Sequence, residues 1–132
     1  MAKPPSAHIL IVEDDSELLE VLKFVLEDAG YEVSVASTGA QALESIGSKP
    51  VDLVVLDVDL NGLSGLDFAR EVRARAGPTR LRIALHTGLE EDSIRREFSD
   101  YDLFMPKGDD ANVLLKLIAG VLATPGEPAS AS

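Results

Sequence analysis

Five polar residues in this chain follow short apolar runs, and together they are of types that could bind a cation and accept a phosphoryl group. They are Glu13, Asp14, Asp57, Thr87 and Lys107. Because the carboxyl ends of parallel strands meet at one edge of a sheet, we expect these side chains to lie close together there. Such an edge would hold three carboxylates, one hydroxyl and one amine.

The three acids predict a magnesium site at this edge. Mg2+ prefers carboxylate oxygens and retains several waters. Clustered carboxylates repel one another, and a divalent cation relieves that repulsion. Asp57 is placed to attack phosphorus and give an acyl phosphate. Thr87 could donate a hydrogen bond to one phosphoryl oxygen, and Lys107 could place its positive charge against another.

Alternating strands and helices must position these residues. Apolar runs predict strands, and apolar residues at helical spacing predict the helices between them. The strands are expected at 8–12, 31–36, 51–56, 81–85 and 102–105, and the helices at 16–29, 38–46, 66–77, 90–98 and 110–122. This order predicts an α/β fold, a doubly wound, flavodoxin-like parallel sheet of five strands in the order 2-1-3-4-5 with helices on both faces.

Local signals set the expected ends of several helices. Asp15 is expected to cap the first helix, and Gly30 to end it. Gly47, followed by Pro50, is expected to stop the second. The inner face of the last helix is expected to carry Val113, Leu114, Leu117, Ile118 and Val121.

Length and composition fit one domain and exclude several classes of protein. The chain has 132 residues and a net charge of −11, which argues against nucleic-acid binding. It has no cysteine, and therefore no disulfide or thiolate site. We find no membrane span or signal peptide, and we expect a cytoplasmic protein. We expect a flexible lead at 1–6, one domain at 7–122 and a disordered tail at 123–132.

The pattern resembles the receiver domain of two-component response regulators over residues 8–122. The resemblance rests on the acid pair after the first strand and on Asp57, Thr87 and Lys107 after the next three strands of the site. Asp57 lies 43 residues after Asp14, and Thr87 lies 30 residues after Asp57, close to the family's intervals. The resemblance implies a stand-alone receiver that is not an enzyme and takes its phosphoryl group from a histidine kinase or a histidine phosphotransfer protein.

The resemblance also implies a role for each residue. Asp14 would bind Mg2+ directly, and Glu13 would bind it largely through water. Asp57 and the backbone carbonyl of Asp59 would complete the metal ligands. Phe104 matches the family's aromatic switch, which turns inward when the hydroxyl residue binds the phosphoryl group.

Two departures from the family pattern affect the predicted site. Gly108 follows Lys107, where the family has a proline joined by a cis peptide. A cis bond to glycine would cost about 3 kcal/mol, so we expect this loop to be shaped differently. Asp59 adds a negative charge near the path of hydrolytic water, and we hypothesise that it alters the lifetime of the acyl phosphate.

Two other functions compete with a phosphorylated receiver. The segment around Asp57 and Asp59 resembles the first motif of haloacid-dehalogenase phosphatases, although there the motif lies on the first strand of a longer chain. The altered loop after Lys107 keeps open a receiver-like interaction module that is never phosphorylated. His86 is interpreted as a buried structural histidine and not as a catalytic one.

Overall fold

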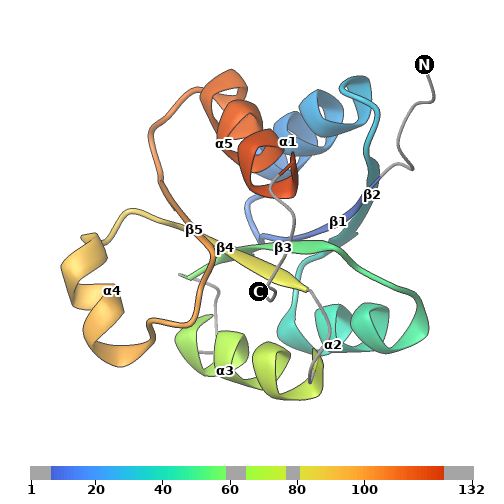
Figure 1. Ribbon diagram of the computed structural model, residues 1–132. Helices are drawn as coiled ribbons and strands as arrows, with labels where there is room; N and C mark the ends of the chain where they lie inside the picture. Colours follow the sequence, from blue (N-terminus) through green and yellow to red (C-terminus); the bar gives the residue numbers. More distant parts are fainter. Residues whose placement is uncertain (1–6, 59–64, 77–80, 124–132) are drawn as a thin grey trace.

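A parallel sheet of five strands, with helices on both faces, forms the centre of the computed structural model (Figure 1). The model describes residues 7–58, 65–76 and 81–123. The strands are β1 (His8–Val12), β2 (Glu32–Ala36), β3 (Leu53–Asp57), β4 (Arg82–Thr87) and β5 (Leu103–Pro106). The helices are α1 (Ser16–Asp28), α2 (Gly39–Ser48), α3 (Gly65–Ala76), α4 (Glu91–Glu97) and α5 (Ala111–Ala123).

The strand order is β2-β1-β3-β4-β5, and every pairing is parallel. This confirms the predicted flavodoxin-like fold. Register brings Val12 opposite Leu56, and Asp57 opposite His86. Since the strands all run in one direction, their carboxyl ends share one edge, where the predicted site residues lie.

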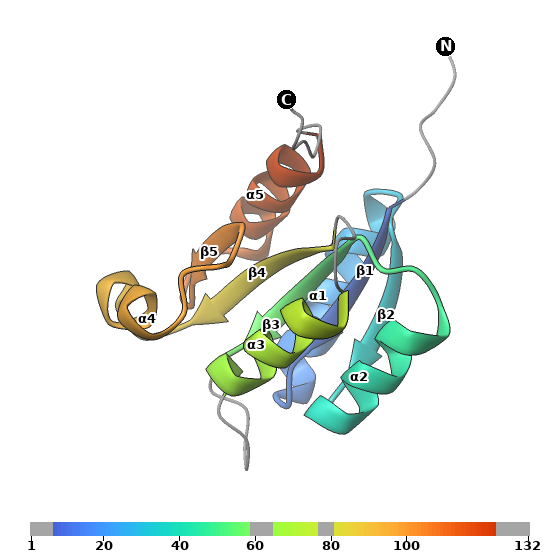
Figure 2. The same cartoon turned by 60° about the horizontal axis from the view of Figure 1, so that its bottom comes forward.

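Alternation along the strands divides the core into two apolar layers. Ile11, Val55 and Ala84 face α1 and α5, where they pack with Leu22 and Ile118. The residues that follow each of them face the other side of the sheet, where α2 and α3 lie (Figures 1 and 2). The central strands β1 and β3 are buried along their whole length, as strands covered on both faces must be.

The helix ends follow their local sequences, with one exception. The carboxylate of Asp15 accepts hydrogen bonds from the backbone N–H groups of Glu17 and Leu18, which confirms the predicted cap. Gly30 follows α1 with a φ of 102°, a conformation that favours glycine. The prediction that Gly47 stops the second helix was wrong, because α2 continues to Ser48. A glycine weakens a helix without ending it.

The strands and the last helix differ in detail from the prediction. β4 extends through Thr87, two residues further than expected, so Thr87 ends the strand and does not follow it. On α5, Leu114 and Ile118 are buried as predicted, whereas Val113 and Leu117 are 44% and 37% exposed. Their assignment to the inner face was wrong because a single helix face buries only about every third or fourth residue. In the described part of the chain, every helix is too short or too polar to cross a bilayer.

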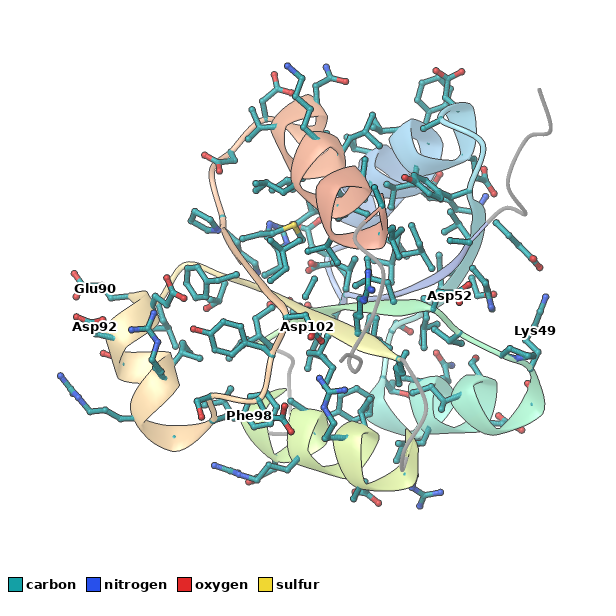
Figure 3. All side chains as sticks on the ribbon, viewed as in Figure 1. Lys49, Asp52, Glu90, Asp92, Phe98 and Asp102 are labelled. Carbon is teal, nitrogen blue, oxygen red and sulfur yellow. The ribbon has the colours of Figure 1, made fainter. Side chains whose placement is uncertain are left out.

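His8 lies at the amino end of the sheet, opposite to the predicted site. Its Nδ1 lies 2.7 Å from the carbonyl oxygen of Pro50, and its Nε2 lies 2.6 Å from Oγ of Ser34. Its backbone N–H donates to the carboxylate of Asp52, which Figure 3 labels near the start of β3. Both ring nitrogens are therefore partnered, and this buried histidine has a structural role.

Candidate functional site

The side-chain period of two in the strands decides which polar residues meet. Glu13 lies two residues after Ile11, Asp57 two after Val55, and His86 two after Ala84 in β4. These residues therefore continue the layer that faces α1 and α5, at the carboxyl edge of the sheet. Three neighbouring strands thus bring two acids and an imidazole into one row.

Asp14 adds a third carboxylate to the two acids of this row. Glu13, Asp14 and Asp57 each offer one oxygen, and these oxygens lie within 4.8 Å of one another. Glu13 is 2% exposed and Asp57 is 1% exposed, whereas Asp14 is open to solvent. The cluster is the donor set that a hard divalent cation prefers, with an exposed side for waters or substrate.

Burial makes the charge of Glu13 costly. It raises the pKa of the Glu13 carboxyl above 4.5, and the neighbouring Asp57 raises it further. The His86 imidazole and the backbone N–H of Asp15, which donates to Oε2 of Glu13 at 3.2 Å, oppose this rise. The balance leaves the pKa raised, so the charged form of Glu13 is disfavoured at this position.

Lys107 brings a positive charge to Asp57, the predicted phospho-acceptor. Its Nζ lies 2.9 Å from Oδ1 of Asp57. Its backbone N–H donates a 2.7 Å hydrogen bond to the carbonyl of Thr87, which extends the β4–β5 pairing past Pro106. The next residue, Gly108, has a φ of 104°, and every peptide bond in the described segments is trans. The turn that follows Lys107 therefore takes a backbone conformation that favours glycine and needs no cis peptide bond.

Thr87 completes the edge from the other face of the sheet. The residue is fully buried, and its Oγ1 accepts a 3.0 Å hydrogen bond from the backbone N–H of Leu89. Because this bond uses the hydroxyl oxygen as the acceptor, the hydroxyl hydrogen is still able to donate to another group.

Of the two remaining predicted residues, the structure describes Phe104 but not Asp59. Phe104 is half-buried, packs against the apolar layer on the α2 and α3 side, and has its ring centroid 6.3 Å from that of Tyr101. Tyr101 in turn donates a hydrogen bond to the carboxylate of Glu91 in α4, so Phe104 is connected with this helix through Tyr101. Asp59, predicted to offer its backbone carbonyl to the metal, lies outside the described residues.

Sequence reasoning missed the place of His86 in this site. The residue is 2% exposed, and its Nδ1 lies 3.9 Å from Oε1 of Glu13 with no hydrogen-bond partner in the described structure. Burial was predicted, but proximity to the acids was not. The available signal was the period of two, which places residue 86 on the same face as Asp57, to which it is paired.

The fold and this edge together define a class: a doubly wound domain with acids, a hydroxyl and a lysine at the carboxyl ends of its strands. The model of the response regulator receiver domain family matches residues 9–119. The chain therefore belongs to this family of phospho-acceptor signalling domains in two-component systems.

Relatives and solved structures agree with this assignment. The chain is 31% identical over 122 residues to the DNA-binding response regulator MtrA of Mycobacterium tuberculosis, covering 92% of this chain and 54% of MtrA. It is 38% identical over 104 residues to the transcriptional activator PfeR of Pseudomonas aeruginosa, covering 78% of this chain and 33% of PfeR. It thus spans about half or less of the length of these curated relatives.

Two crystal structures show the likeness of fold. The response regulator TrrA of Thermotoga maritima, solved with Mg2+ and BeF, has a TM-score of 0.77 at 30% identity, covering 87% of this chain and 98% of TrrA. A two-component response regulator of Clostridium difficile has a TM-score of 0.83 at 23% identity, covering 92% of this chain and all of that one. The second likeness concerns the fold alone.

Proposed function

We propose that this chain accepts a phosphoryl group on Asp57 and in that way changes its affinity for a protein partner. The observation that supports this most is the 2.9 Å contact between Nζ of Lys107 and Oδ1 of Asp57, beside two further carboxylates. A buried acid paired with a lysine at an open edge is suited to a nucleophile whose product carries additional negative charge.

The proposed donor is a phosphohistidine on a histidine kinase or a histidine phosphotransfer protein. A carboxylate oxygen of Asp57 attacks phosphorus in line, the new phosphorus–oxygen bond forms, and the phosphorus–nitrogen bond breaks. The imidazole leaves with the electron pair of that bond and takes a proton from solvent. Lys107 lies against the carboxylate and stabilises charge on the phosphoryl oxygens, so catalysis consists of positioning and electrostatics.

Glu13, Asp14 and Asp57 would hold a magnesium ion at this edge, and their three oxygens fit the ligand preference of that ion. When bound, the ion neutralises negative charge on the carboxylates and on the incoming phosphoryl group. Asp59, the fourth predicted ligand, stays a prediction.

Thr87 and Phe104 are the residues that would transmit phosphorylation from the site to the rest of the domain. The Thr87 hydroxyl would donate to a phosphoryl oxygen, which would pull on the segment that its bond to Leu89 now holds. Phe104 would turn toward the space that Thr87 leaves, away from Tyr101. Phosphorylation can shift such an equilibrium only as far as it stabilises one state over the other.

Intact-protein mass spectrometry tests this function. The wild-type chain and an Asp57→Asn variant are incubated with Mg2+ and acetyl phosphate. We expect the mass of one phosphoryl group to be gained by the wild type alone. If neither acetyl phosphate nor a range of phosphohistidine donors modifies the wild type, the proposal is wrong and the non-phosphorylated interaction module becomes the better explanation.

Two alternatives have less support. The family match covers the segment that resembles the haloacid-dehalogenase motif, so that alternative has nothing further in its favour. Although MtrA is called DNA-binding, this chain spans only 54% of it. With a net charge of −11 we propose no nucleic-acid binding for the residues present.

A further inference from the structure

Tyr101 joins the amino end of α4 to the segment that leads into β5. Its hydroxyl donates a 2.5 Å hydrogen bond to the carboxylate of Glu91, in the first turn of α4. The same carboxylate lies 2.9 Å from Nη2 of Arg95, one turn further along the helix, and Nε of Arg95 donates to the Tyr101 hydroxyl at 3.4 Å. Because its acceptor is charged, the bond from Tyr101 is stronger than one between neutral groups.

The two ends of α4 are held to the domain in different ways. At the carboxyl end, Phe98 is buried and Arg70 donates to the carbonyl oxygen of Glu97 at 2.8 Å. At the amino end, Glu90 is the N-cap, but its side chain makes no capping bond (Figure 3). Among the contacts that the structure describes, the bond from Tyr101 is the side-chain hydrogen bond that ties the first turn of α4 to another part of the domain.

Thr87 and Phe104, the residues proposed to respond to phosphorylation, both hold this amino end. Thr87 accepts a hydrogen bond from the backbone N–H of Leu89, two residues before the helix begins. The ring centroid of Phe104 lies 6.3 Å from that of Tyr101, and both rings pack against the same apolar layer. Movement of Thr87 and Phe104 would therefore disturb both attachments of this end of α4.

We propose that Tyr101 is a positioning residue through which phosphorylation of Asp57 controls α4. Before phosphorylation, its bond to Glu91 fixes the amino end of the helix. When Phe104 turns, Tyr101 loses the ring against which it packs, and the bond to Glu91 is released. The side chains of Glu91 and Arg95 then become available to a partner. This inference rests on the proposed function and names the helix that transmits it.

A bond that is made only before phosphorylation must also resist phosphorylation, because coupling between two sites is reciprocal. Its loss should increase the fraction of molecules in the state that accepts the phosphoryl group. We expect Tyr101→Phe to accelerate uptake from acetyl phosphate about fivefold, the factor that one hydrogen bond contributes to a ratio of populations. Tyr31→Phe is the matched control, because Tyr31 precedes the opposite edge strand β2, and it should leave the rate unchanged.

Two further variants test the route of the effect by intact-protein mass spectrometry. Glu91→Ala, which removes the acceptor, should accelerate uptake as Tyr101→Phe does, and the double variant should be no faster than either. If Tyr101 acts through Phe104, its bond no longer differs between the two states in Phe104→Ala. Adding Tyr101→Phe to Phe104→Ala should therefore give no acceleration.

Tyrosine fluorescence gives a readout that does not depend on rates. The chain has two tyrosines and no tryptophan, so in a Tyr31→Phe background the emission comes from Tyr101 alone. A carboxylate that accepts a hydrogen bond from a phenol quenches this emission. We expect the emission to rise in Glu91→Ala. It should also rise when Asp57 is phosphorylated, or when beryllofluoride and Mg2+ are added to imitate the phosphoryl group.

The outcomes separate this inference from a purely structural role and from the proposed function. If Tyr101→Phe leaves uptake unchanged or slows it, or if phosphorylation leaves the Tyr101 emission unchanged, Tyr101 only stabilises the fold and the inference is wrong. The emission decides the question even if Tyr101→Phe fails to fold, because it is measured on a chain that keeps Tyr101.

Uptake with unchanged emission would refute this inference alone. Emission that rises with beryllofluoride, in a chain that no phosphoryl donor modifies, would refute the proposed function alone. A chain that responds to neither would refute both.

Discussion

Nζ of Lys107 lies 2.9 Å from Oδ1 of Asp57, although the two residues are 50 positions apart in the chain. Asp57 is buried at the end of a central strand, and Lys107 reaches it from the turn after the edge strand. The contact holds a cation against a carboxylate before any donor arrives. Such preorganisation is what transition-state stabilisation requires.

Replacing the charged side chain of Lys107 should impair both phosphoryl transfer and the stability of the fold. We expect Lys107→Met to slow phosphoryl uptake from acetyl phosphate by roughly a hundredfold. It should also lower the free energy of unfolding by about 2 kcal/mol, because Asp57 loses its charged partner while buried. Lys116→Met, at an exposed position of α5, is the matched control and should change neither quantity. Equal uptake rates in both variants would show that Lys107 does not stabilise the transfer.

Removing one charge from the acid cluster should stabilise the metal-free protein. The pKa of Glu13 is raised by burial and by Asp57, so its neutral form fits the fold better than its carboxylate. The stability that this group contributes is therefore complete below pH 4.5 and is lost as the pH rises through the higher folded pKa. At neutral pH we expect Glu13→Gln to raise the free energy of unfolding by about 1 kcal/mol without metal.

The same variant should bind a divalent cation more weakly, by roughly tenfold. Chemical denaturation with and without the cation measures both effects. Asp28→Asn, which removes an exposed acid near the end of α1, is the control for net charge. A metal-free Glu13→Gln variant that is less stable than the wild type would contradict the electrostatic account.

The amide of Leu89 should report the state of Thr87. Its N–H donates to Oγ1 of Thr87 at 3.0 Å, so a change in the position or hydrogen bonding of the hydroxyl must change the environment of this amide. We expect phosphorylation to shift the Leu89 amide resonance in the wild type and in Thr87→Ser, and to leave it nearly unmoved in Thr87→Val. A similar shift in all three proteins would show that Thr87 is not part of the proposed switch.

Arg73 should contribute more to stability than the other arginines of α3. Its guanidinium donates to the carbonyl oxygens of Leu81 and Asp100 and to the carboxylate of Asp102, which lies near the start of β5 (Figure 3). That carboxylate also accepts from the backbone N–H of Ile83 in β4. One side chain thus connects α3 with the segments that begin β4 and β5.

We expect Arg73→Ala to lower the free energy of unfolding by about 2 kcal/mol. Arg75→Ala is the matched control, because Arg75 pairs only across one helical turn with exposed Glu71 among the contacts described, and it should cost less than about 0.5 kcal/mol. Equal losses in the two variants, measured by chemical denaturation, would contradict the structural role of Arg73.

Tyr101 should titrate above its ordinary range. Burial raises its pKa, and so does its 2.5 Å hydrogen bond to the carboxylate of Glu91, while Arg95 opposes the shift. The neutral phenol therefore stabilises the fold below pH 10, and this contribution is lost as the pH rises through the folded pKa. In a Tyr31→Phe background, tyrosinate absorbance should give a midpoint above 10, and Glu91→Gln should lower it. A midpoint that Glu91→Gln leaves unchanged would show that the bond is absent in solution.

The sequence by itself determined the order of the elements and the identity of the acids. Apolar runs that end in polar residues predict buried strands whose carboxyl ends carry Glu13, Asp57 and Thr87. Asp15 and Gly30 mark the ends of the first helix by local hydrogen bonding and backbone conformation alone. Such signals depend on neighbours within a few residues, so they can be read without the fold.

Only the tertiary structure decided which side chains meet. It placed His86 beside Glu13, and it left Val113 and Leu117 exposed on a helix whose pattern predicted an inner face. These outcomes depend on strand register and on how helices cover the sheet, which join residues far apart in the chain. Period and spacing fix the direction of a side chain within its own element, but the neighbours that it contacts are set by the packing of the whole domain.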